Sequence, residues 1–466
     1  MDHALYNDDL DLQRTLTRES LAGAFSAGVG SAELVGMEVE NGLVDQVTGC
    51  SVPYGGEQGA RALLDLMVRA TDGTPLFDLA DVSGSHPIGV KLPNGASFTL
   101  ETGGALEYAS KPTASLAQAV RVAEADLLVT AALAERLGIA LLSGACLPFT
   151  PPAKIPWIPK PRVKVMRDYF NRLGESGEHA EAVMGVTLST QTSLDYLSGQ
   201  DFIDKLRLHV RAAPIVSALF VNSPIADGGY AGVMSRRMQY WQRFDPRRCG
   251  VLEFALTENA SVDDFFDWTL KLPMIYRDGQ RSHVPAPYRT FADLMNDGFG
   301  DGTWPTLADW QLHLCQVWPH VRPRSTLELR ASDGLPWPYF SAAPAIWVGL
   351  TYDAAVRKEA SALLSELTPF QLERAVEDIA VKGLAASVGP HPVRDLAHEL
   401  LRLARQGLEN RVAAQVDPPE VLSYLEPLEQ VDGDGETFAD KCLALWESEL
   451  GQSPSAYVRR FRIPFD

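Results

Sequence analysis

The stretch LETGGALEYASKP, residues 100–112, decides the fold. A strand-like run breaks at Gly103 and Gly104 and then resumes, with Glu101 and Glu107 on the two sides of the break. Glycines have no Cβ, so paired glycines let a backbone turn tightly and approach another group closely. The pattern predicts a glycine turn at the edge of a sheet. Because like charges repel, the two nearby carboxylates indicate that the neighbouring group is a cation.

Composition places the chain among ordinary globular proteins. Its 466 residues are 46% hydrophobic and 22% charged, which is enough to bury a sizeable core. The net charge is −19, with 60 acidic residues against 41 Lys and Arg. Nucleic-acid binders need a basic face, so we expect no nucleic-acid partner, and docking on an anionic membrane is also disfavoured.

Targeting signals and cysteine usage bear on the compartment. No stretch approaches the roughly 20 apolar residues that span a bilayer, and the start MDHALYNDDL is too acidic for a signal or transit peptide. The five cysteines are odd in number, scattered and free of any C-x-x-C pair. This usage predicts reduced thiols and a cytoplasmic protein without membrane partners.

Periodicity predicts an alternating first half and a helical end. ELVGMEVENGLVD (33–45) alternates with period two and should stop at the turn signal Asn41-Gly42, while SFTLET (97–102) is a second strand. VMGVTLSTQTSLDY (183–196) also reads as a strand. Residues 1–350 are expected to form the catalytic core. Residues 351–466 are expected to form a helical portion packed on the same domain.

Helix boundaries are marked by capping residues. A helix is expected from Thr113 to about Gly138, with Ser115 and Gln118 as a capping box, and another from about 165 to 173. Thr368-Pro369 with Gln371 predicts a capped helix that Gly383 ends. The proline-rich segment 148–163 is expected to be an ordered loop. The acidic run at 432–436 is interpreted as a solvated loop, because it does not match a calcium-binding loop.

Several well-known catalytic motifs are absent from the sequence. It contains no phosphate-binding G-x-x-x-x-G-K-[ST] loop, and the pair Gly28 and Gly30 lacks the third glycine of a dinucleotide fingerprint. No G-x-S-x-G elbow or H-E-x-x-H zinc motif occurs either.

The acidic residues form a candidate metal site. Glu38 and Glu40 are two apart on a predicted strand, so both side chains leave the same face. Glu101 and Glu107 share a parity, and Glu328 lies in the strand-like STLELRASD (325–333). Hard carboxylate oxygens suit Mg²⁺ or Mn²⁺. From spacing alone, a solvated outer face with surface ion pairs remains an open alternative.

Nine segments in the same order give the chain a family resemblance. They are GMEVE (36–40), ETGGALEYAS (101–110), IPKPRVKVMRDYF (158–170), STQTSLDY (189–196), APIVSALFVNSP (213–224), SRRMQYWQRFDPRRCG (235–250), DWQLHLCQVWPHVR (309–322), LELRASD (327–333) and APAIWVGLTYD (343–353). Together they resemble the plant-type glutamate–cysteine ligase family, also called γ-glutamylcysteine synthetase type 2, which is widespread in bacteria. The resemblance covers roughly residues 34–410.

The resemblance implies a fold and a reaction. The fold is α+β and glutamine-synthetase-like: an antiparallel sheet curved into a half-funnel, with helices on its outer face. In the reaction, ATP phosphorylates the γ-carboxylate of L-glutamate, and the amine of L-cysteine attacks the acyl phosphate. The product is γ-glutamylcysteine, used for glutathione or ergothioneine. The implied partners are small molecules, namely glutamate, an amino-acid amine and ATP with Mg²⁺ or Mn²⁺, and the implied protein is a monomer or homodimer.

The resemblance also assigns roles to individual residues. The implied metal ligands are Glu38, Glu40, Glu101, Glu107 and Glu328. Arg167 and Arg237 are the candidates for the substrate carboxylates, with Gln191, Ser193 and Ala105 also at the substrate site. Arg330 is the candidate for the ATP phosphates, helped by Lys160 or Arg248. We expect Arg330 and Arg237 to be the catalytic residues.

Two departures from the plant pattern concern the acceptor. Plant members read G-G-Q where this chain has Ala105 after its two glycines, although bacterial relatives also carry alanine. Plant members read Q-x-N-L-D where this chain has Ser193. Three alternatives therefore stay open: the same chemistry with another amino acid in a specialised pathway, phosphoryl transfer without ligation, or a non-catalytic metabolite-binding relative. Retention of all five acids argues against the last.

Overall fold

A large antiparallel sheet organises the computed structural model, which describes residues 16–78, 84–279 and 282–465. In the described part, nine strands pair in the order β14-β15-β7-β1-β5-β4-β3-β2, and β6 pairs with the far end of β1. The strands are β1 (Val35–Asp45), β2 (Thr74–Phe77), β3 (Pro87–Lys91), β4 (Ser97–Leu100), β5 (Leu106–Ala109), β6 (Ile139–Leu142), β7 (Thr190–Leu194), β14 (Val321–Pro323) and β15 (Leu327–Leu329). This confirms the expected α+β class.

Helices precede, interrupt and follow these strands. The first group is α1 (Arg18–Ala27), α2 (Ala60–Thr71), α3 (Leu116–Glu135), α4 (Pro161–Asn171), α5 (Ala180–Val186), α6 (Gly199–Ala218), α7 (Arg236–Trp241), α8 (Val262–Leu270), α9 (Phe291–Asp297) and α10 (Leu307–Leu314). The second group is α11 (Ala342–Thr351), α12 (Ala354–Leu363), α13 (Pro369–Lys382), α14 (Val393–Ala413), α15 (Glu426–Asp434), α16 (Phe438–Glu447) and α17 (Pro454–Phe461).

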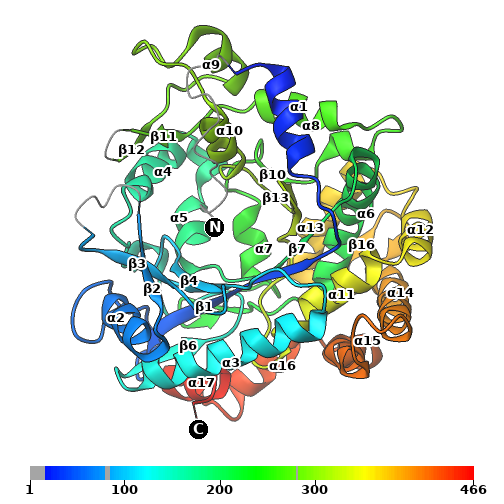
Figure 1. Cartoon of the computed structure of the whole chain (residues 1–466). Coiled ribbons are helices and arrows are strands. Elements are labelled where there is room, and N and C mark those ends of the chain that lie inside the picture. Colours follow the sequence, from blue (N-terminus) through cyan, green and yellow to red (C-terminus); the bar gives the residue numbers. More distant parts are fainter. Residues whose placement is uncertain (1–15, 79–83, 280–281, 466) are drawn as a thin grey trace.

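Short strand pairs lie outside the large sheet. They are β8 (Ile225–Ala226) with β9 (Gly229–Tyr230), β10 (Cys249–Gly250) with β13 (Trp318–Pro319), β11 (Tyr276–Asp278) with β12 (His283–Pro285), and β16 (Ser387–Val388) with β17 (His391–Pro392). The hairpin of β11 and β12 contacts α4, and α5 contacts α7. Figure 1 shows α5 and α7 near the centre of the view, inside a surround of strands and longer helices.

The sheet has one apolar and one polar face. On β1, Val35, Met37 and Val39 are buried, whereas the alternate residues Glu38 and Glu40 keep some exposure. Helices α3 and α11 contact β1, and α6 contacts β14 and β15. These helices cover the apolar face, because burying apolar surface is the main favourable term in folding. The polar face is left for the functional site.

The turn predicted at Asn41-Gly42 is wrong, because the strand continues there and changes its pairing partner. Strand β1 continues through Asn41 and Gly42 to Asp45. It pairs with β5 as far as Asn41 and with β6 from Gly42 onward. A Cβ at position 42 would collide with the side chain of Leu147. The glycine therefore serves a close approach between segments and not a hairpin.

Two other local predictions need correction. The segment 183–196 begins as the end of α5 and becomes strand only at Thr190, where β7 starts. The acidic run at 432–436 is not all loop, since α15 continues to Asp434 and ends at Gly435 in the left-handed conformation. Asp432 accepts a hydrogen bond from His398 Nδ1 at 2.7 Å, so this acid is held by a partner.

The capping predictions were largely confirmed. Thr368 and Gln371 form the capping box of α13, and Gly383 ends that helix with φ 56°. Ser115 caps α3 by accepting the Gln118 backbone N–H at 3.2 Å. The Gln118 side chain accepts instead from Thr113, so the second half of that predicted capping box is replaced. Helix α4 starts at Pro161, four residues before the expected start, because proline suits the first helical position.

The helices after residue 350 pack on the rest of the chain. Helices α12, α13 and α14 contact α6, and α11 contacts α14. Helix α17 contacts β6, and the Ile463 backbone N–H donates to the Leu141 carbonyl at 2.8 Å. The last residues thus supply hydrogen bonds along the free side of β6, where unpaired backbone groups would otherwise remain.

The glycine turn between β4 and β5 is fixed by contact with α5. A Cβ at Gly103 would lie well inside the contact distance of the Gly185 backbone. Gly104 has φ 92°, a conformation that favours glycine. The two positions therefore require glycine for different reasons. Gly103 lets two backbones touch, and Gly104 adopts the positive φ of the turn.

We expect Gly103→Ala to lower the free energy of unfolding by about 1–3 kcal/mol, because the collision is with backbone that cannot rotate away. Gly23→Ala on α1 is the matched control, since nothing lies within 4 Å of the added Cβ. That change should be neutral or slightly stabilising. Chemical denaturation of both variants measures the difference, and equal stabilities would contradict the close contact.

Candidate functional site

Strand register brings the predicted acids onto one face of the sheet. Glu40 lies opposite Glu107 across β1 and β5, and Glu38 lies opposite Gln191 across β1 and β7. Glu328 on β15 lies opposite Ser193 on β7. Directly opposed residues in antiparallel strands point to the same side. Side chains from four strands thus meet on the polar face, although the residues are up to 290 positions apart in sequence (Glu38 to Glu328: 328 − 38).

Glu101 joins this face from the glycine turn. Its backbone N–H donates to the Ala105 carbonyl at 2.8 Å, which continues the pairing of β4 with β5. The two intervening glycines do not shift the register, so Glu101 and Glu107 share a face as their parity predicted. Lys160, just before α4, lies beside the turn because its Nζ donates to the Leu100 carbonyl.

Burial and mutual repulsion raise the pKa values of three carboxyls. The pKa of Glu107 is raised well above its usual range by burial and then by the charges of Glu38, Glu101 and Glu40. Burial and Glu101 raise the pKa of Glu40 to about 7. Burial and then Glu328 raise the pKa of Glu38. The raised pKa values indicate that cations of the described residues do not fully balance these three carboxylates.

Flanking cations lower the pKa values of the other two carboxyls. Burial opposes ionisation of Glu101, but Lys160 and Arg162 outweigh it and the pKa falls. At Glu328, burial is likewise outweighed, here by Arg322, Arg330 and Arg324, and the pKa falls to about 2. Burial and Arg162 lower the pKa of Lys160 to about 8. The acidic centre is thus bordered by positive charge on two sides.

The donor set fits a hard divalent cation. All five side chains offer carboxylate oxygens, and burial with neighbouring carboxylates raises the pKa values of three of them. Within residues 16–78, 84–279 and 282–465, no three acidic, His or Cys side chains converge closely enough to chelate an ion as they stand. The oxygens of Glu328 are engaged by arginines.

Gln191 links the acidic centre to Arg330. Its Nε2 donates to Glu40 Oε1 at 3.4 Å, and its Oε1 accepts from Arg330 Nη1 at 2.5 Å. The same Nη1 also donates to Glu328 Oε1. Ser189 completes the group by donating to Glu40 Oε2 at 2.9 Å. The structure therefore brings Arg330 and Gln191 together with the acids, as expected.

Arg237 is buried beside this group and holds the backbone after β15. Its Nη2 and Nη1 donate to the carbonyls of Arg330 and Ala331 at 2.8 and 2.9 Å. Its Nε is buried without a partner among the described residues. Asp333 lies 3.7 Å from Arg237 Nη1 and accepts from Ser223 and Ser235. Burial lowers the pKa of Arg237, and Asp333 and Glu40 oppose that shift.

Two predicted arginines are engaged away from the carboxylates. Arg248 is fully buried and donates to Tyr169, Asp245 and the carbonyls of Gln316 and Pro273. Those bonds use its donors in packing, so the structure does not bring it to a phosphate site. Arg167 forms an ion pair with Glu181 at 2.6 Å and stacks on Trp157 at 4.8 Å. The side chain of Arg167 is 38% exposed, so it is accessible to a ligand.

The two positions that depart from the plant pattern have different surroundings. Ser193 lies on the polar face between Gly36 and Glu328. Ala105 is 5% exposed and belongs to an apolar cluster that also contains Ile155 and Met184. Ser193 therefore adjoins the acids directly, whereas Ala105 adjoins them through the turn.

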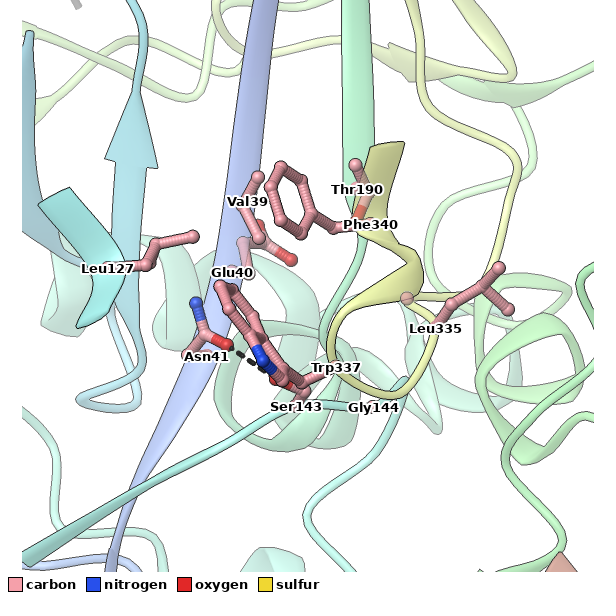
Figure 2. Close-up of a pocket in the computed structure, with 11 residues that line it drawn as sticks. Val39, Glu40, Asn41, Leu127, Ser143, Gly144, Thr190, Leu335, Trp337 and Phe340 are labelled. Carbon is pink, nitrogen blue, oxygen red and sulfur yellow. Dashed lines mark hydrogen bonds between the residues drawn. The ribbon is translucent and has the colours of Figure 1, made fainter. Parts of the chain in front are cut away.

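A small cavity lies on the apolar side of β1 and is shown in Figure 2. Asn41 and Ser143 face each other there, and Ser143 Oγ donates to Asn41 Oδ1 at 3.1 Å. Trp337 and Phe340 also line it. Its volume of about 10 Å³ is near that of one water molecule, so it is too small for any substrate.

The sequence analysis missed Arg322 and Asp333 as site residues. Arg322 lies opposite Glu328 in the hairpin of β14 and β15. The turn between the two strands includes an Arg324 N–H bond to the Thr326 carbonyl at 2.8 Å. Asp333 lies in LELRASD (327–333), in which Glu328 and Arg330 were the predicted site residues. Neither residue stands out by spacing alone.

The chain is similar in sequence to a known family of proteins. A family model described as glutamate-cysteine ligase family 2 (GCS2) matches residues 34–458. The chain belongs to this family of ligases. It is 30% identical over 441 residues to the chloroplastic glutamate–cysteine ligase of Nicotiana tabacum, covering 94% of this chain and 81% of that one. It is 32% identical over 374 residues to glutamate–cysteine ligase B of Oryza sativa subsp. japonica, covering 80% and 73%.

A solved structure shows the same fold at low sequence identity. The glutamate–cysteine ligase of Francisella tularensis, solved in complex with AMP, superposes with a TM-score of 0.54 at 14% identity. The match covers 93% of this chain and 89% of that one. Each described helix of this chain is too short or too polar to cross a membrane.

The raised pKa of Glu107 predicts a pH-dependent effect of Glu107→Gln in metal-free protein. A carboxyl whose pKa is raised on folding binds its proton more tightly in the folded state, so stability falls as pH rises above about 4.3. Glutamine removes that loss. We expect the variant to be more stable than the parent at pH 8, with the gain shrinking toward pH 5.

Chemical denaturation at several pH values with a chelator present measures this difference. Glu57→Gln, at an exposed carboxylate, is the control and should show no pH-dependent gain. Equal destabilisation of the Glu107 variant at pH 5 and pH 8 would contradict the charge repulsion. Excess Mg²⁺ should reverse the order at pH 8, by stabilising the parent alone.

Proposed function

We propose that this family member joins the γ-carboxylate of L-glutamate to the amine of L-cysteine in an ATP-dependent reaction. The observation that supports this most is the set of five carboxylates on one sheet face, with Arg330 beside them. An idle site has no need for so many close like charges. The names of the similar proteins, which are glutamate–cysteine ligases, support the same substrates.

Activation of glutamate comes first in the proposed reaction. A γ-carboxylate oxygen attacks the terminal phosphorus of ATP, the bond to ADP breaks, and an acyl phosphate forms. Glu38, Glu40, Glu101, Glu107 and Glu328 would hold Mg²⁺, which neutralises phosphate charge when bound. Arg330 supplies a guanidinium to the transferring phosphoryl group, and Lys160 adds charge beside the glycine turn.

Amide formation is the second step. The amine nitrogen attacks the acyl carbon, the carbon–oxygen bond to phosphate breaks, and the amine loses a proton. Arg237 offers a buried Nε that has no partner among the described residues, and Arg167 offers an accessible guanidinium, so these two are our candidates for substrate carboxylates. Gln191 fixes Arg330 relative to Glu40 while both substrates are bound.

A second candidate function differs only in the acceptor. Ser193 lies on the polar face next to Gly36, whose missing side chain leaves room beside it. A small hydroxyl in place of an amide changes the hydrogen bonds offered to a substrate there. The same chemistry with another amino acid in a specialised pathway is therefore the runner-up, and phosphoryl transfer without ligation ranks below it.

The deciding experiment is ADP release from Mg-ATP and L-glutamate across a panel of amino-acid acceptors, with products identified by mass. We expect γ-glutamylcysteine as the main product. Turnover with a different amino acid and little with cysteine would establish the runner-up. ADP release independent of any amine, with a phosphorylated product, would establish a phosphotransferase. Absence of ADP release with every acceptor would contradict all three.

Glu38→Gln should lower turnover by about 100-fold or more, because it removes a charge from the proposed metal site while keeping the side-chain shape. Glu57→Gln, at an exposed carboxylate, is the matched control and should keep parental activity. Circular dichroism verifies that both variants are folded. Parental activity in the Glu38 variant would remove this residue from the site.

Ser193→Asn tests the acceptor assignment. If the side chain at position 193 contacts the acceptor, the asparagine amide should change the acceptor KM by about 10-fold and leave the glutamate KM within about twofold. Thr192→Ser is the control on the same strand, because its side chain points to the apolar face. An unchanged order of acceptor preference in the Asn variant would place acceptor selection elsewhere.

A further inference from the structure

Arg322 is the most fully engaged cation on the polar face. Its Nη2 donates to Glu328 Oε1 and Oε2 at 2.8 and 2.9 Å, and its Nε donates to Oε2 at 3.0 Å. Its side chain is 6% exposed, and the Glu328 side chain is 4% exposed. The two residues lie directly opposite each other in the hairpin of β14 and β15. Two-point pairing between opposed strands fixes both side chains.

Glu328 has little room for a further partner. A carboxylate has about four acceptor positions. Three are taken by Arg322, and Arg330 Nη1 takes another on Oε1. Any cation that binds Glu328 must therefore displace one of these two arginines.

The two arginines are held very unequally. Arg322 is nearly inaccessible and makes three bonds to one carboxylate, whereas Arg330 is 13% exposed. Among the described residues, only Nη1 of Arg330 makes side-chain hydrogen bonds, to Gln191 and Glu328. Arg330 is the partner that can leave.

We propose that Arg322 is a positioning residue of the nucleotide site, which keeps Glu328 in place so that Arg330 can exchange that carboxylate for a phosphate group. The proposal rests on the proposed ATP-dependent function. Arg322 does not touch the nucleotide. Its contribution is that Glu328 stays paired and oriented after Arg330 departs.

The energetic reason is the cost of a buried, unpaired carboxylate. If Arg322 is removed, Arg330 is the one described residue left within hydrogen-bond distance of Glu328, and Arg324 Nη1 is 4.0 Å away. Breaking one partner of a buried pair leaves an uncompensated charge. Arg330 would then be retained on Glu328, and nucleotide would have to compete for it. Weaker nucleotide binding with unchanged glutamate binding is the expected signature.

The test compares Arg322→Gln with the matched control Arg324→Gln. Both remove one positive charge near Glu328, but Arg324 lies 4.0 Å away and is 31% exposed. Steady-state kinetics gives the KM values for Mg-ATP and for glutamate, and titration calorimetry gives the affinity for a non-hydrolysable ATP analogue with Mg²⁺. Arg322→Lys is the second variant, since it keeps the charge and loses two-point pairing.

We expect Arg322→Gln to weaken nucleotide binding by about 10-fold or more and Arg322→Lys by a smaller factor, with the glutamate KM within about twofold. Arg324→Gln should change nucleotide binding by less than about threefold. If Arg322→Gln does not fold, as shown by circular dichroism, the Lys variant decides. A purely structural role would lower the melting temperature or the active fraction while both KM values stay parental, and that result overturns the proposal.

The outcome separates this proposal from the proposed function. If the parent protein binds no Mg-nucleotide at all, the ATP-dependent function is wrong and the positioning role is wrong with it. If the parent binds nucleotide and both Arg322 variants bind it equally well, only the positioning role is wrong. Equal weakening in the Arg322 and Arg324 variants would show a general charge effect, which also overturns the positioning role.

Discussion

Repulsion among carboxylates on one sheet face is the constraint on which the rest of the structure depends. Burial and then the charges of neighbouring carboxylates raise the pKa values of Glu38, Glu40 and Glu107. Such an arrangement costs stability in the absence of positive charge. The fold offsets this cost by closing a large apolar face against helices on the opposite side of the same strands. Packing of the apolar face thus compensates for the repulsion between carboxylates on the polar face.

Positive charge is distributed around this centre with a clear asymmetry. Glu328 is neutralised by the arginines of the β14 and β15 hairpin, and Glu101 is neutralised from the start of α4. Among the described residues, no cation lowers the pKa of Glu107 in the same way. In the proposed reaction, a divalent ion accompanied by phosphate would fit there, because the ion would satisfy the carboxylates and the flanking guanidinium and ammonium groups would satisfy the phosphate.

Much of the site followed from the sequence, and the failures share a physical cause. Parity placed Glu38 with Glu40, and Glu101 with Glu107, because side chains alternate along strands. Capping chemistry located α13, because those interactions are local. The turn predicted at Gly42 and the strand predicted from 183 were wrong, and Arg322 was not singled out, because each depends on a distant partner. Gly42 meets Leu147, Gly185 meets Gly103, and Arg322 is defined by its opposed Glu328.

Coupling between the two proposed steps centres on the short segment after β15. Arg237 on α7 donates to the carbonyls of Arg330 and Ala331. Asp333 accepts from Ser235, the N-cap of that helix, and from Ser223. A displacement of α7 would therefore move the backbone that carries Arg330. The proposed glutamate contact and the proposed phosphate contact are thus parts of one hydrogen-bonded unit. Occupation of either should bias the geometry of the other, which suits a reaction in which ATP must not lose its terminal phosphate to water before glutamate is in place.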